Sequence, residues 1–270
     1  MRRIMLKIAY DGTDYVGWQM QPNGVAVEQV INKALSELLK EDIVIAGASR
    51  TDSGVHADGN VAVFDTETRI PAEKICFALN QRLPKDIVCL ESCEVKPDFH
   101  PRHADCTKTY EYSIYNAVHP DPLKRRYSYF VYVPLDIDAM RKAAEYLKGE
   151  HDFSSFCSAH AQVKTTVRNV YSLEILCEKI DRRDGSLIEN NDRRIYMAHD
   201  IKIRISGNGF LYNMVRIIVG TLVKVGYHFY PPEYVKTILD ACDRTKAGPK
   251  APAEGLKLVG IEYDPGDYKK

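Results

Sequence analysis

The chain has 270 residues, of which 45% are hydrophobic, and its 37 basic and 37 acidic residues give a formal net charge of zero. This length and composition are typical of a soluble globular protein with one large core or two moderate ones. The neutral balance argues against a protein that coats nucleic acid through bulk charge. No stretch approaches the roughly 20 apolar residues of a membrane-spanning helix, and the N-terminus becomes polar too early for a signal peptide, so we expect a cytoplasmic protein.

The chain contains seven cysteines. The odd number leaves at least one unpaired, and the closest pair, Cys89 and Cys93, has neither a second pair nor a nearby histidine that would complete a zinc site. We therefore expect reduced, mostly buried thiols and no metal centre. A Cys–His nucleophile pair stays open as an alternative, although no local signature supports it.

The first part of the chain predicts the element order β-α-β-β-α-β. Alternating apolar residues indicate strands, and apolar residues at steps of three and four indicate helices. The predicted elements are a strand over 3–10, a helix over 27–40, strands over 43–47 and 60–66, a helix near 71–83 and a strand over 86–95. The segment GASRTDSGVHADGN, residues 47–60, would then contain the turn between the two short strands.

The second part of the chain follows a similar order. Its predicted elements are a strand over 108–116, a helix over 136–150, strands over 165–177 and 193–207, helices over 210–226 and 231–243, and a last strand over 256–263. We expect an α+β fold with two ferredoxin-like β-α-β-β-α-β halves, residues 1–105 and 106–270, with mostly antiparallel sheets joined side by side and helices on one face. A Rossmann-type sheet is the alternative, but GNGFLY lacks the third glycine of a dinucleotide loop.

The segment 47–60 carries charges that an ordinary turn does not need. Asp52 opens an Asp-Ser-Gly turn, which by itself explains the aspartate, but Arg50 and His56 have no such explanation. An arginine near a carboxylate keeps it ionised, and an ionised, oriented aspartate can act as a nucleophile or as a base. An aspartic protease is excluded, because it needs a second such triplet and a proton shared by two carboxylates, which an arginine would disturb.

Basic residues gather in two further segments. Residues 202–224 contain four basic side chains and no acid, and KRRYSYF, residues 124–130, interleaves basic and aromatic side chains. Such patches suit a phosphate backbone with stacked bases, although each patch alone is more typical of a solvated face. Arg216 lies in the apolar segment NMVRIIVG. Because burying an unpaired guanidinium is costly, we expect a carboxylate partner for it.

GASRTDSGVHADGNVAVF closely resembles the signature of the tRNA pseudouridine synthase A family, and further blocks in the same order extend the resemblance over nearly the whole chain. These blocks are IAYDGTDYVGWQMQPNGVAVEQVINKAL, ALNQRLPKDI, KTYEYSIYN, HDFSSFCS, GNGFLYNMVRIIVGTLVKVG and APAEGLKLVGIEY. The resemblance implies an isomerase that converts uridine to pseudouridine in the anticodon stem-loop of tRNAs, at positions 38–40, without cofactor or metal. It also implies a homodimer that binds tRNA, with neither DNA nor membrane as a partner.

The same resemblance implies roles for individual residues in a catalytic cleft between the halves. Asp52 would be the catalytic aspartate, which either attacks ribose C1′ or takes a proton from C2′. Arg50 and Arg216 would be its charged neighbours, and Tyr110 would lie beside the uracil. Residues expected to contact substrate are His56, Asn208, Phe210, Lys124, Arg125 and Arg126. Positions that depart from the family pattern are Ser49, Ser53, Asn60 and Lys257, and residues 178–194 look like an insertion.

A noncatalytic RNA-binding module built on the same fold is the competing hypothesis. It would explain the basic and aromatic patches equally well. The RNA-recognition consensus with its stacking aromatics is absent, however, and a module that only binds RNA has no use for Asp52 beside Arg50. The two hypotheses differ in whether replacing Asp52 abolishes a reaction.

Overall fold

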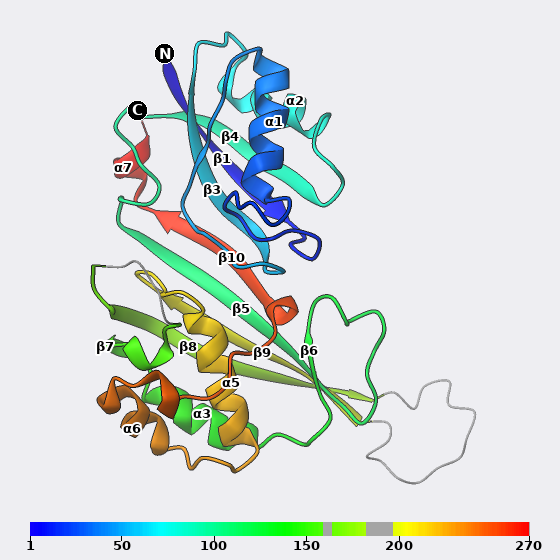
Figure 1. Ribbon diagram of the computed structural model, residues 1–270, viewed down its shortest axis with the longest axis vertical. Coiled ribbons are helices and arrows are strands. Elements are labelled where there is room, and N and C mark those ends of the chain that lie inside the picture. The colour runs from blue at the N-terminus through cyan, green and yellow to red at the C-terminus, as the bar shows by residue number, and fades with distance from the viewer. Residues whose placement is uncertain (159–163, 182–196, 270) are drawn as a thin grey trace, which may run out of the picture. The chain divides into compact units, whose positions relative to one another are not determined.

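The computed structural model describes residues 1–158, 164–181 and 197–269. Among these residues, ten strands and six helices form a protein whose strand pairs are mostly antiparallel, which confirms the α+β part of the expected fold. The chain forms two compact units (Figure 1). Unit 1 comprises residues 1–108 and 257–270, and unit 2 comprises residues 109–256.

Unit 1 contains a sheet with two helices on one face (Figure 1). The sheet strands, in spatial order, are β4 (Ile87–Val95), β1 (Arg2–Tyr10), β3 (His56–Thr66) and β10 (Leu256–Tyr263). β1 is antiparallel to β3 and β4, whereas β10 is parallel to β3. The short strand β2 (Ala46–Gly47) also pairs with β3. The helices of this unit are α1 (Val27–Leu39), α2 (Ala72–Asn80) and the short C-terminal α7 (Pro265–Tyr268).

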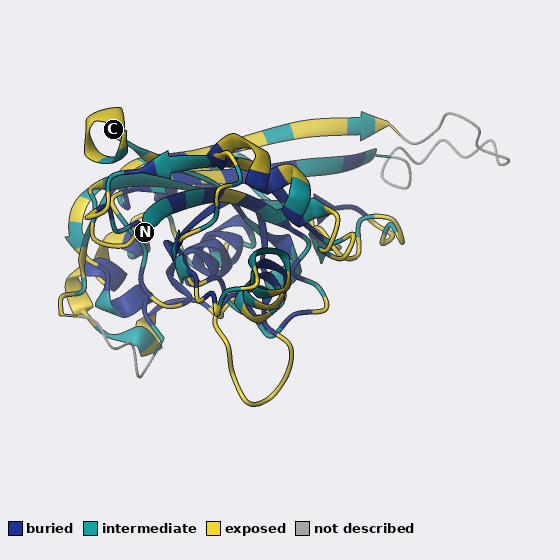
Figure 2. Ribbon diagram, turned by 90° about the horizontal axis from the view of Figure 1, so that it is seen from above, coloured by how far each residue is buried: buried dark blue, intermediate teal, exposed yellow. Residues whose placement is uncertain are grey.

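The core of unit 1 follows from the apolar periodicity. Ile4, Leu6 and Ile8 occupy alternate positions of β1 and are no more than 1% exposed, as the two-residue period of a strand requires. Val27, Ile31 and Leu35 recur at helical spacing in α1 and are fully buried. Figure 2 shows the resulting alternation of buried and less buried residues along the strands.

Unit 2 has its own antiparallel strands and a more deeply buried helix. Its strands, in spatial order, are β5 (Cys106–Asn116), β9 (Met197–Gly207), β8 (Val167–Asp181) and β7 (Gly149–Asp152), with β6 (Tyr129–Val131) parallel to the end of β5. Its helices are α3 (Ile137–Glu145), α5 (Met214–Gly226) and α6 (Tyr234–Ala241). α5 is buried nearly all round, which matches its apolar sequence.

Several predicted boundaries were wrong. The strand predicted over 43–47 is only two residues long, and the strand predicted over 60–66 begins at His56. Residues 56–60, which include Gly59, therefore belong to a strand despite their turn-like composition, because β3 pairs there with both β1 and β10. The helix predicted over 210–226 begins at Met214, since Asn213 has a left-handed backbone with φ of 62°.

The last strand belongs with the first unit rather than with the second. β10 pairs in parallel with β3, with Lys257 opposite His56 and Leu258 opposite Ala57. The division therefore differs from the expected boundary after residue 105, because residues 257–270 join unit 1. The strand β7 was not predicted. In the expected insertion 178–194, β8 continues to Asp181, and residues 182–194 lie outside the described residues.

All seven cysteines are free thiols, as predicted, but only Cys76, Cys89 and Cys157 are buried, so the expectation that most of them are buried was wrong. Burial raises the pKa of Cys89 to about 12, so this thiol is protonated at neutral pH. Among the described residues, no helix combines the length and the hydropathy needed to cross a membrane.

Candidate active site

The turn that carries Asp52 spans residues 48–55, between β2 and β3. Its side chains alternate between the interior and the surface. Ser49 and Thr51 are buried, Arg50 is exposed, and Asp52 is half-buried. Because the alternation resembles that of an extended strand, Arg50 and Asp52 lie on the accessible side of the turn.

Hydrogen bonds fix the backbone on both sides of Asp52. The Thr51 hydroxyl shares a hydrogen bond of 2.7 Å with the Tyr10 hydroxyl, and the Thr51 carbonyl accepts the Trp18 N–H at 3.1 Å. The Asp52 carbonyl accepts the Val55 N–H at 3.1 Å, which closes the turn. The position of Asp52 is therefore determined by buried groups in β1 and in the loop after it.

The loop after β1 passes beneath the turn in backbone contact. Gly17 has φ of 108°, a conformation that favours glycine, and a Cβ atom there would lie 2.7 Å from the Thr51 carbonyl oxygen. A Cβ atom on Gly12 would lie 2.0 Å from the Val55 carbonyl oxygen. Both glycines are thus required by close approach of the loop to the residues flanking Asp52.

Asn60 anchors the start of the turn from within β3. Its side chain is fully buried, its Oδ1 accepts the N–H groups of Ser49 and Val61 at 3.3 and 3.0 Å, and its Nδ2 donates to the Ser49 carbonyl at 3.0 Å. Ser49 and Asn60, two positions that depart from the family pattern, are therefore direct hydrogen-bond partners.

His56 joins the turn to the loop after β1. Its Nδ1 lies 3.1 Å from the Gly12 nitrogen and 3.1 Å from Asp11 Oδ1. One ring nitrogen cannot serve both groups at once: without a proton it accepts the Gly12 N–H, and with a proton it donates to Asp11. The ring is buried, so this geometry indicates a structural link; the contact of His56 with substrate stays a prediction.

Two basic side chains that the sequence analysis did not single out bind backbone carbonyls where the chain enters the turn. Arg102 Nη2 donates to the Gly47 carbonyl at 2.8 Å, and Lys108 Nζ donates to the Ala48 carbonyl at 2.9 Å. The two contacts span 55 and 60 positions of the sequence, respectively, so no local sequence motif predicts them.

In unit 2, the structure brings together two of the predicted site residues. Tyr110, on β5, is 8% exposed, and its ring meets the Phe210 ring edge to face, with centroids 5.3 Å apart. Asn208, a third predicted site residue, is bonded to β8, because its Oδ1 accepts the Asn169 N–H at 3.0 Å. The edge-to-face contact orients Phe210 against Tyr110.

Arg216 is buried in α5, and its guanidinium is partly satisfied by neutral oxygens. Nε donates to the Ala251 carbonyl at 2.8 Å and Nη1 to Asn213 Oδ1 at 3.2 Å. Ala251 in turn donates its N–H to the Arg216 carbonyl at 3.0 Å. These bonds fix the orientation of the side chain, while the expected carboxylate partner stays a prediction.

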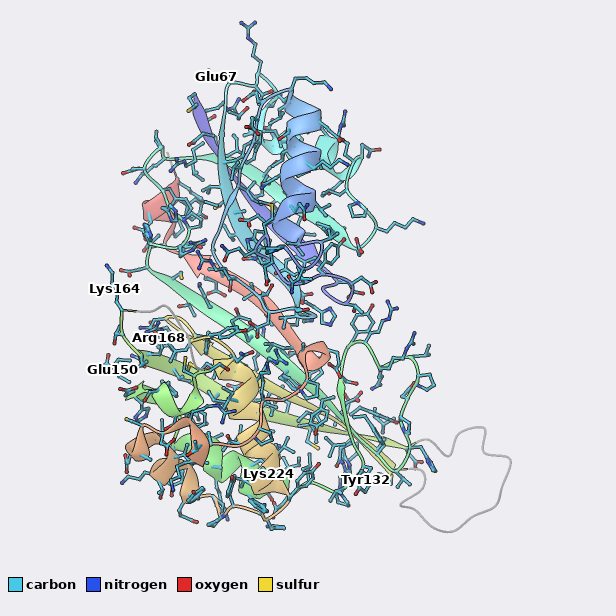
Figure 3. All side chains as sticks on the ribbon, viewed as in Figure 1. Glu67, Tyr132, Glu150, Lys164, Arg168 and Lys224 are labelled. Carbon is cyan, nitrogen blue, oxygen red and sulfur yellow. The ribbon has the colours of Figure 1, made fainter. Side chains whose placement is uncertain are left out.

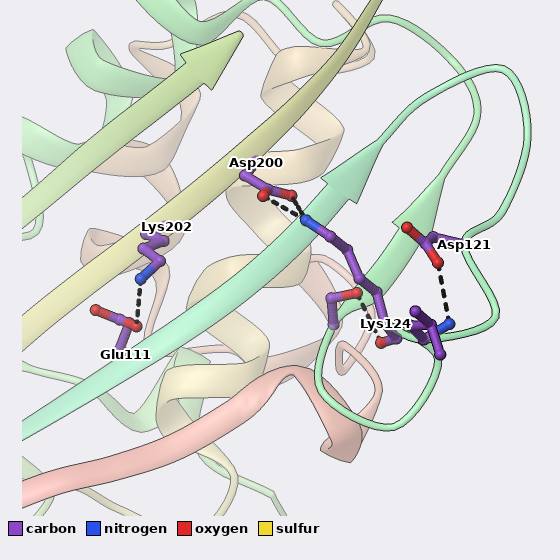
Figure 4. A network of polar contacts seen from close by, with 7 residues as sticks. Glu111, Asp121, Lys124, Asp200 and Lys202 are labelled. Carbon is purple, nitrogen blue, oxygen red and sulfur yellow. Dashed lines mark hydrogen bonds and ion pairs between the residues drawn. The ribbon is translucent and has the colours of Figure 1, made fainter. Parts of the chain in front are cut away.

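The predicted RNA-contact residues 124–126 differ in their surroundings. Lys124 pairs with Asp200 (Figure 4) and lies 4.9 Å from the Tyr115 ring, whereas Arg125 is exposed and donates to the Pro122 carbonyl at 2.8 Å. The charge of Lys124 is thus largely engaged within unit 2. Arg125 is the more accessible cation of the two.

The basic segment 202–224 is also partly engaged. Lys202 Nζ lies 3.3 Å from Glu111 Oε1 (Figure 4). At its other end lies Lys224, which is labelled in Figure 3, and its Nζ is 4.7 Å from the centroid of the Phe229 ring. The segment is therefore less available to phosphate than its sequence indicates. Among the described residues, no group of three or more histidine, cysteine or acidic side chains could hold a metal ion.

Comparison with known proteins follows the same blocks of sequence. A family model described as tRNA pseudouridine synthase matches residues 7–103 and 143–264. The match includes Asp52, Arg216 and Arg102, and leaves out residues 104–142, which contain Tyr110 and the patch 124–126.

Curated relatives match the chain over almost its whole length. A protein of Ruminiclostridium cellulolyticum named tRNA pseudouridine synthase A is 47% identical over 265 residues, which cover 97% of this chain and 100% of the relative. Proteins of Brevibacillus brevis and Clostridium perfringens, named tRNA pseudouridine synthase A and A 2, are 46% and 44% identical with the same coverage.

Proposed function

Because the chain belongs to the tRNA pseudouridine synthase family, it is an isomerase that converts uridine to pseudouridine in tRNA, and we propose that its targets are uridines 38–40 of the anticodon stem-loop. The reaction breaks the bond from uracil N1 to ribose C1′, turns the base, and joins C5 to C1′. It involves no net redox change and transfers no group to a second molecule, so no step requires a cofactor.

One observation carries the proposal: the turn presents Asp52 and Arg50 on its accessible side while its buried residues lock the backbone. Asp52 would act in its ionised form, either by attack on C1′ or by removal of a C2′ proton. Arg50, two residues away, favours the ionised form through its positive charge. A carboxylate oriented in advance loses little conformational entropy as the reaction proceeds.

Roles in unit 2 complete the proposed chemistry. We assign Tyr110 to stack against the target uracil and to assist removal of the C5 proton, with Phe210 orienting its ring. We assign Arg216 to stabilise the catalytic carboxylate, as the family resemblance implies; within unit 2 its guanidinium is buried and donates to the Ala251 carbonyl. Arg125 and Arg126 would contact the RNA backbone together with Lys124, and His56 and Asn208 would line the site.

Three further features belong to the same proposal. We infer that the protein acts on tRNA as a homodimer in the cytoplasm, as the family resemblance implies. We also infer that its halves follow the ferredoxin-like pattern. The order β4-β1-β3 in unit 1, with β2 on the outer side of β3, supports this for the first half.

The test is release of tritium from 5-tritiated uridine in unmodified tRNA transcripts. We expect release by the wild-type protein without added metal or cofactor, and none by Asp52→Asn, which should still bind tRNA. Asp58→Asn is the matched control, since Asp58 is an exposed aspartate on the adjoining strand β3 that pairs with Lys257 at 2.7 Å, and it should turn over at a near-normal rate.

Replacement of single uridines in the transcript identifies the target position. Transcripts in which only uridines 38, 39 or 40 are replaced by cytidine should lose the corresponding release. Turnover by Asp52→Asn close to that of wild type would refute its catalytic role. Tight tRNA binding without release from any transcript would favour the noncatalytic RNA-binding module.

A further inference from the structure

The segment that contains Arg102, between β4 and β5, is held in unit 1 by several contacts. The Phe99 ring meets the Tyr263 ring edge to face at 5.2 Å, and the Phe99 carbonyl accepts Arg3 Nη1 at 3.0 Å. The Tyr263 hydroxyl donates to the Pro101 carbonyl at 2.6 Å. Arg102 therefore extends from a fixed backbone when it binds the Gly47 carbonyl.

Arg102 binds the Gly47 carbonyl, three residues before Arg50, so two like charges belong to the same end of the turn. Partial burial of the guanidinium lowers the pKa of Arg102, the positive charge of Arg50 lowers it further, and the Glu28 carboxylate raises it. Within the part of the chain that the structure describes, neither guanidinium forms an ion pair with a carboxylate, and both side chains are exposed. The Glu28 carboxylate offsets only part of this positive charge, because the pKa of Arg102 stays lowered, and the exposed guanidinium groups can therefore still bind a negative ligand.

The geometry favours a phosphate group as that ligand. A guanidinium has five N–H donors in a planar fork, and Arg102 uses one of its nitrogens, Nη2, for the Gly47 carbonyl. The remaining donors of Arg102 and those of Arg50 match the tetrahedral oxygens of a phosphodiester. Lys108, on the neighbouring Ala48 carbonyl, adds a third positive charge to the same stretch.

We propose that Arg50 and Arg102 form a phosphate-binding site for the RNA strand, which positions the target uridine over Asp52. The inference rests on the proposed function, because the ligand is a backbone phosphate of the substrate tRNA. Arg102 would have two roles, since one donor holds the Gly47 carbonyl and the others bind phosphate. Binding a phosphate next to the target nucleotide would fix the strand after the uridine leaves its stack.

The experiment measures tRNA affinity as a function of salt in an Asp52→Asn background, where no turnover interferes. Arg102→Gln should weaken binding about five- to tenfold at low salt, and the slope of log affinity against log salt should fall by about 0.7 to 0.9, the value for one lost phosphate contact. Arg102→Lys should keep the slope, because it keeps the charge.

Arg82→Gln is the matched control. Arg82 is also an exposed arginine of unit 1 whose Nη1 donates to a backbone carbonyl, that of Ala78, at 3.3 Å. Its replacement should change neither the affinity nor the slope. If Arg102→Gln weakens binding with the slope unchanged, the residue is only a structural clamp or a stacking surface, and the proposal is overturned.

A second variant covers the case in which Arg102→Gln fails to fold. Arg50 makes no hydrogen bond among the described residues, so Arg50→Gln removes the same phosphate site without disturbing the turn. It should lower the slope by the same amount, and an unchanged slope would overturn the proposal. Tritium release by the wild-type protein tests the isomerase activity separately. If tritium is released but the salt slopes of the variants are unchanged, only the phosphate site is refuted. If the salt slopes fall but no tritium is released, only the isomerase activity is refuted.

Discussion

Asn60 is the residue through which the stability of unit 1 and the position of Asp52 are most directly linked. Asn60→Ala leaves the buried N–H and carbonyl groups of Ser49 without their partner, so we expect a loss of about 2–4 kcal/mol in the free energy of unfolding. The entry to the turn should also become mobile, and kcat for pseudouridine formation should fall at least tenfold. Urea unfolding and tritium release measure the two effects.

Asn80→Ala provides the control for this prediction. Asn80 makes a similar pair of bonds, because its Oδ1 accepts the Cys89 N–H at 2.8 Å and its Nδ2 donates to the Cys89 carbonyl at 2.9 Å. It lies at the end of α2, away from the turn, so its replacement should lower stability and leave kcat unchanged. Equal losses of kcat in the two variants would mean that turnover follows general stability.

At the same scale, the sequence pointed to some residues of the proposed site and missed others for a physical reason. Asp52 and Arg50 were predicted because they lie together in one turn with more charge than a turn needs. Arg102 and Lys108 act on carbonyls 55 and 60 residues away, and such contacts exist only after β2, β3 and the segment after β4 have assembled. Local pattern contains no signal for a side chain that binds a distant backbone group.

At the scale of elements, the antiparallel pair of β1 and β3 contains a cross-strand ion pair that makes its stability depend on pH. Arg3 lies opposite Asp65 in the register, and its Nε and Nη2 donate to the two carboxylate oxygens at 2.8 and 2.6 Å. Hydrogen bonding from Arg3 lowers the pKa of Asp65 below its ordinary value. A carboxylate with a lowered pKa in the folded state stabilises that state at neutral pH.

We therefore expect Asp65→Asn to lose about 0.5–1 kcal/mol at pH 7, a small value because the Asp65 side chain is 36% exposed. The difference from wild type should be constant above the unfolded pKa of about 4 and should disappear as the pH falls through the lowered folded pKa. Urea unfolding from pH 7 to pH 3 measures it. Glu91→Gln is the control, since Glu91 is opposite Lys7 but 74% exposed, and a pH-dependent loss there of equal size would contradict the assignment.

The elements also show which boundaries a pattern can predict. The expected bounds of α1 and β10 agree with the structure to within one residue, because their apolar residues recur with an uninterrupted period. The start of β3 was missed because Ala57, Asp58 and Gly59 have low strand propensity. Their neighbours in β1 and β10 supply the pairing that makes them a strand, and those neighbours come from opposite ends of the chain.

At the scale of the whole molecule, unit 1 is closed by the end of the chain. The final residues 257–270 return to pair with β3 and to support the segment that holds Arg102. A reading in chain order assigns the last strand to the second half, since successive elements are usually neighbours. The alternation of apolar residues predicted the strand β10, but its pairing with β3 depends on contacts between residues far apart in the sequence.

The zero net charge of the whole chain leads to a prediction about how it selects tRNA. Arg50, Arg102 and Lys108 gather at one place, so phosphate contacts should dominate affinity although the protein has no overall positive charge. Log affinity for a tRNA transcript should therefore fall steeply with log salt, with a slope of several units, and electrophoretic or fluorescence titration measures it. A flat response would contradict phosphate contact as the main contribution.

A comparison of two stem-loops separates the contribution of charge to affinity from that of shape. One is the RNA anticodon arm, and the other is a DNA stem-loop of the same sequence and charge. The DNA should give a similar salt slope, because the slope counts neutralised phosphates. Its affinity should be at least tenfold weaker at every salt concentration, because it lacks the A-form geometry and the 2′-hydroxyl groups that distinguish RNA. Equal affinities for the two stem-loops would show that the protein recognises charge alone, and the choice of tRNA would then have to arise after binding, at the step where the uridine leaves its stack to enter the active site.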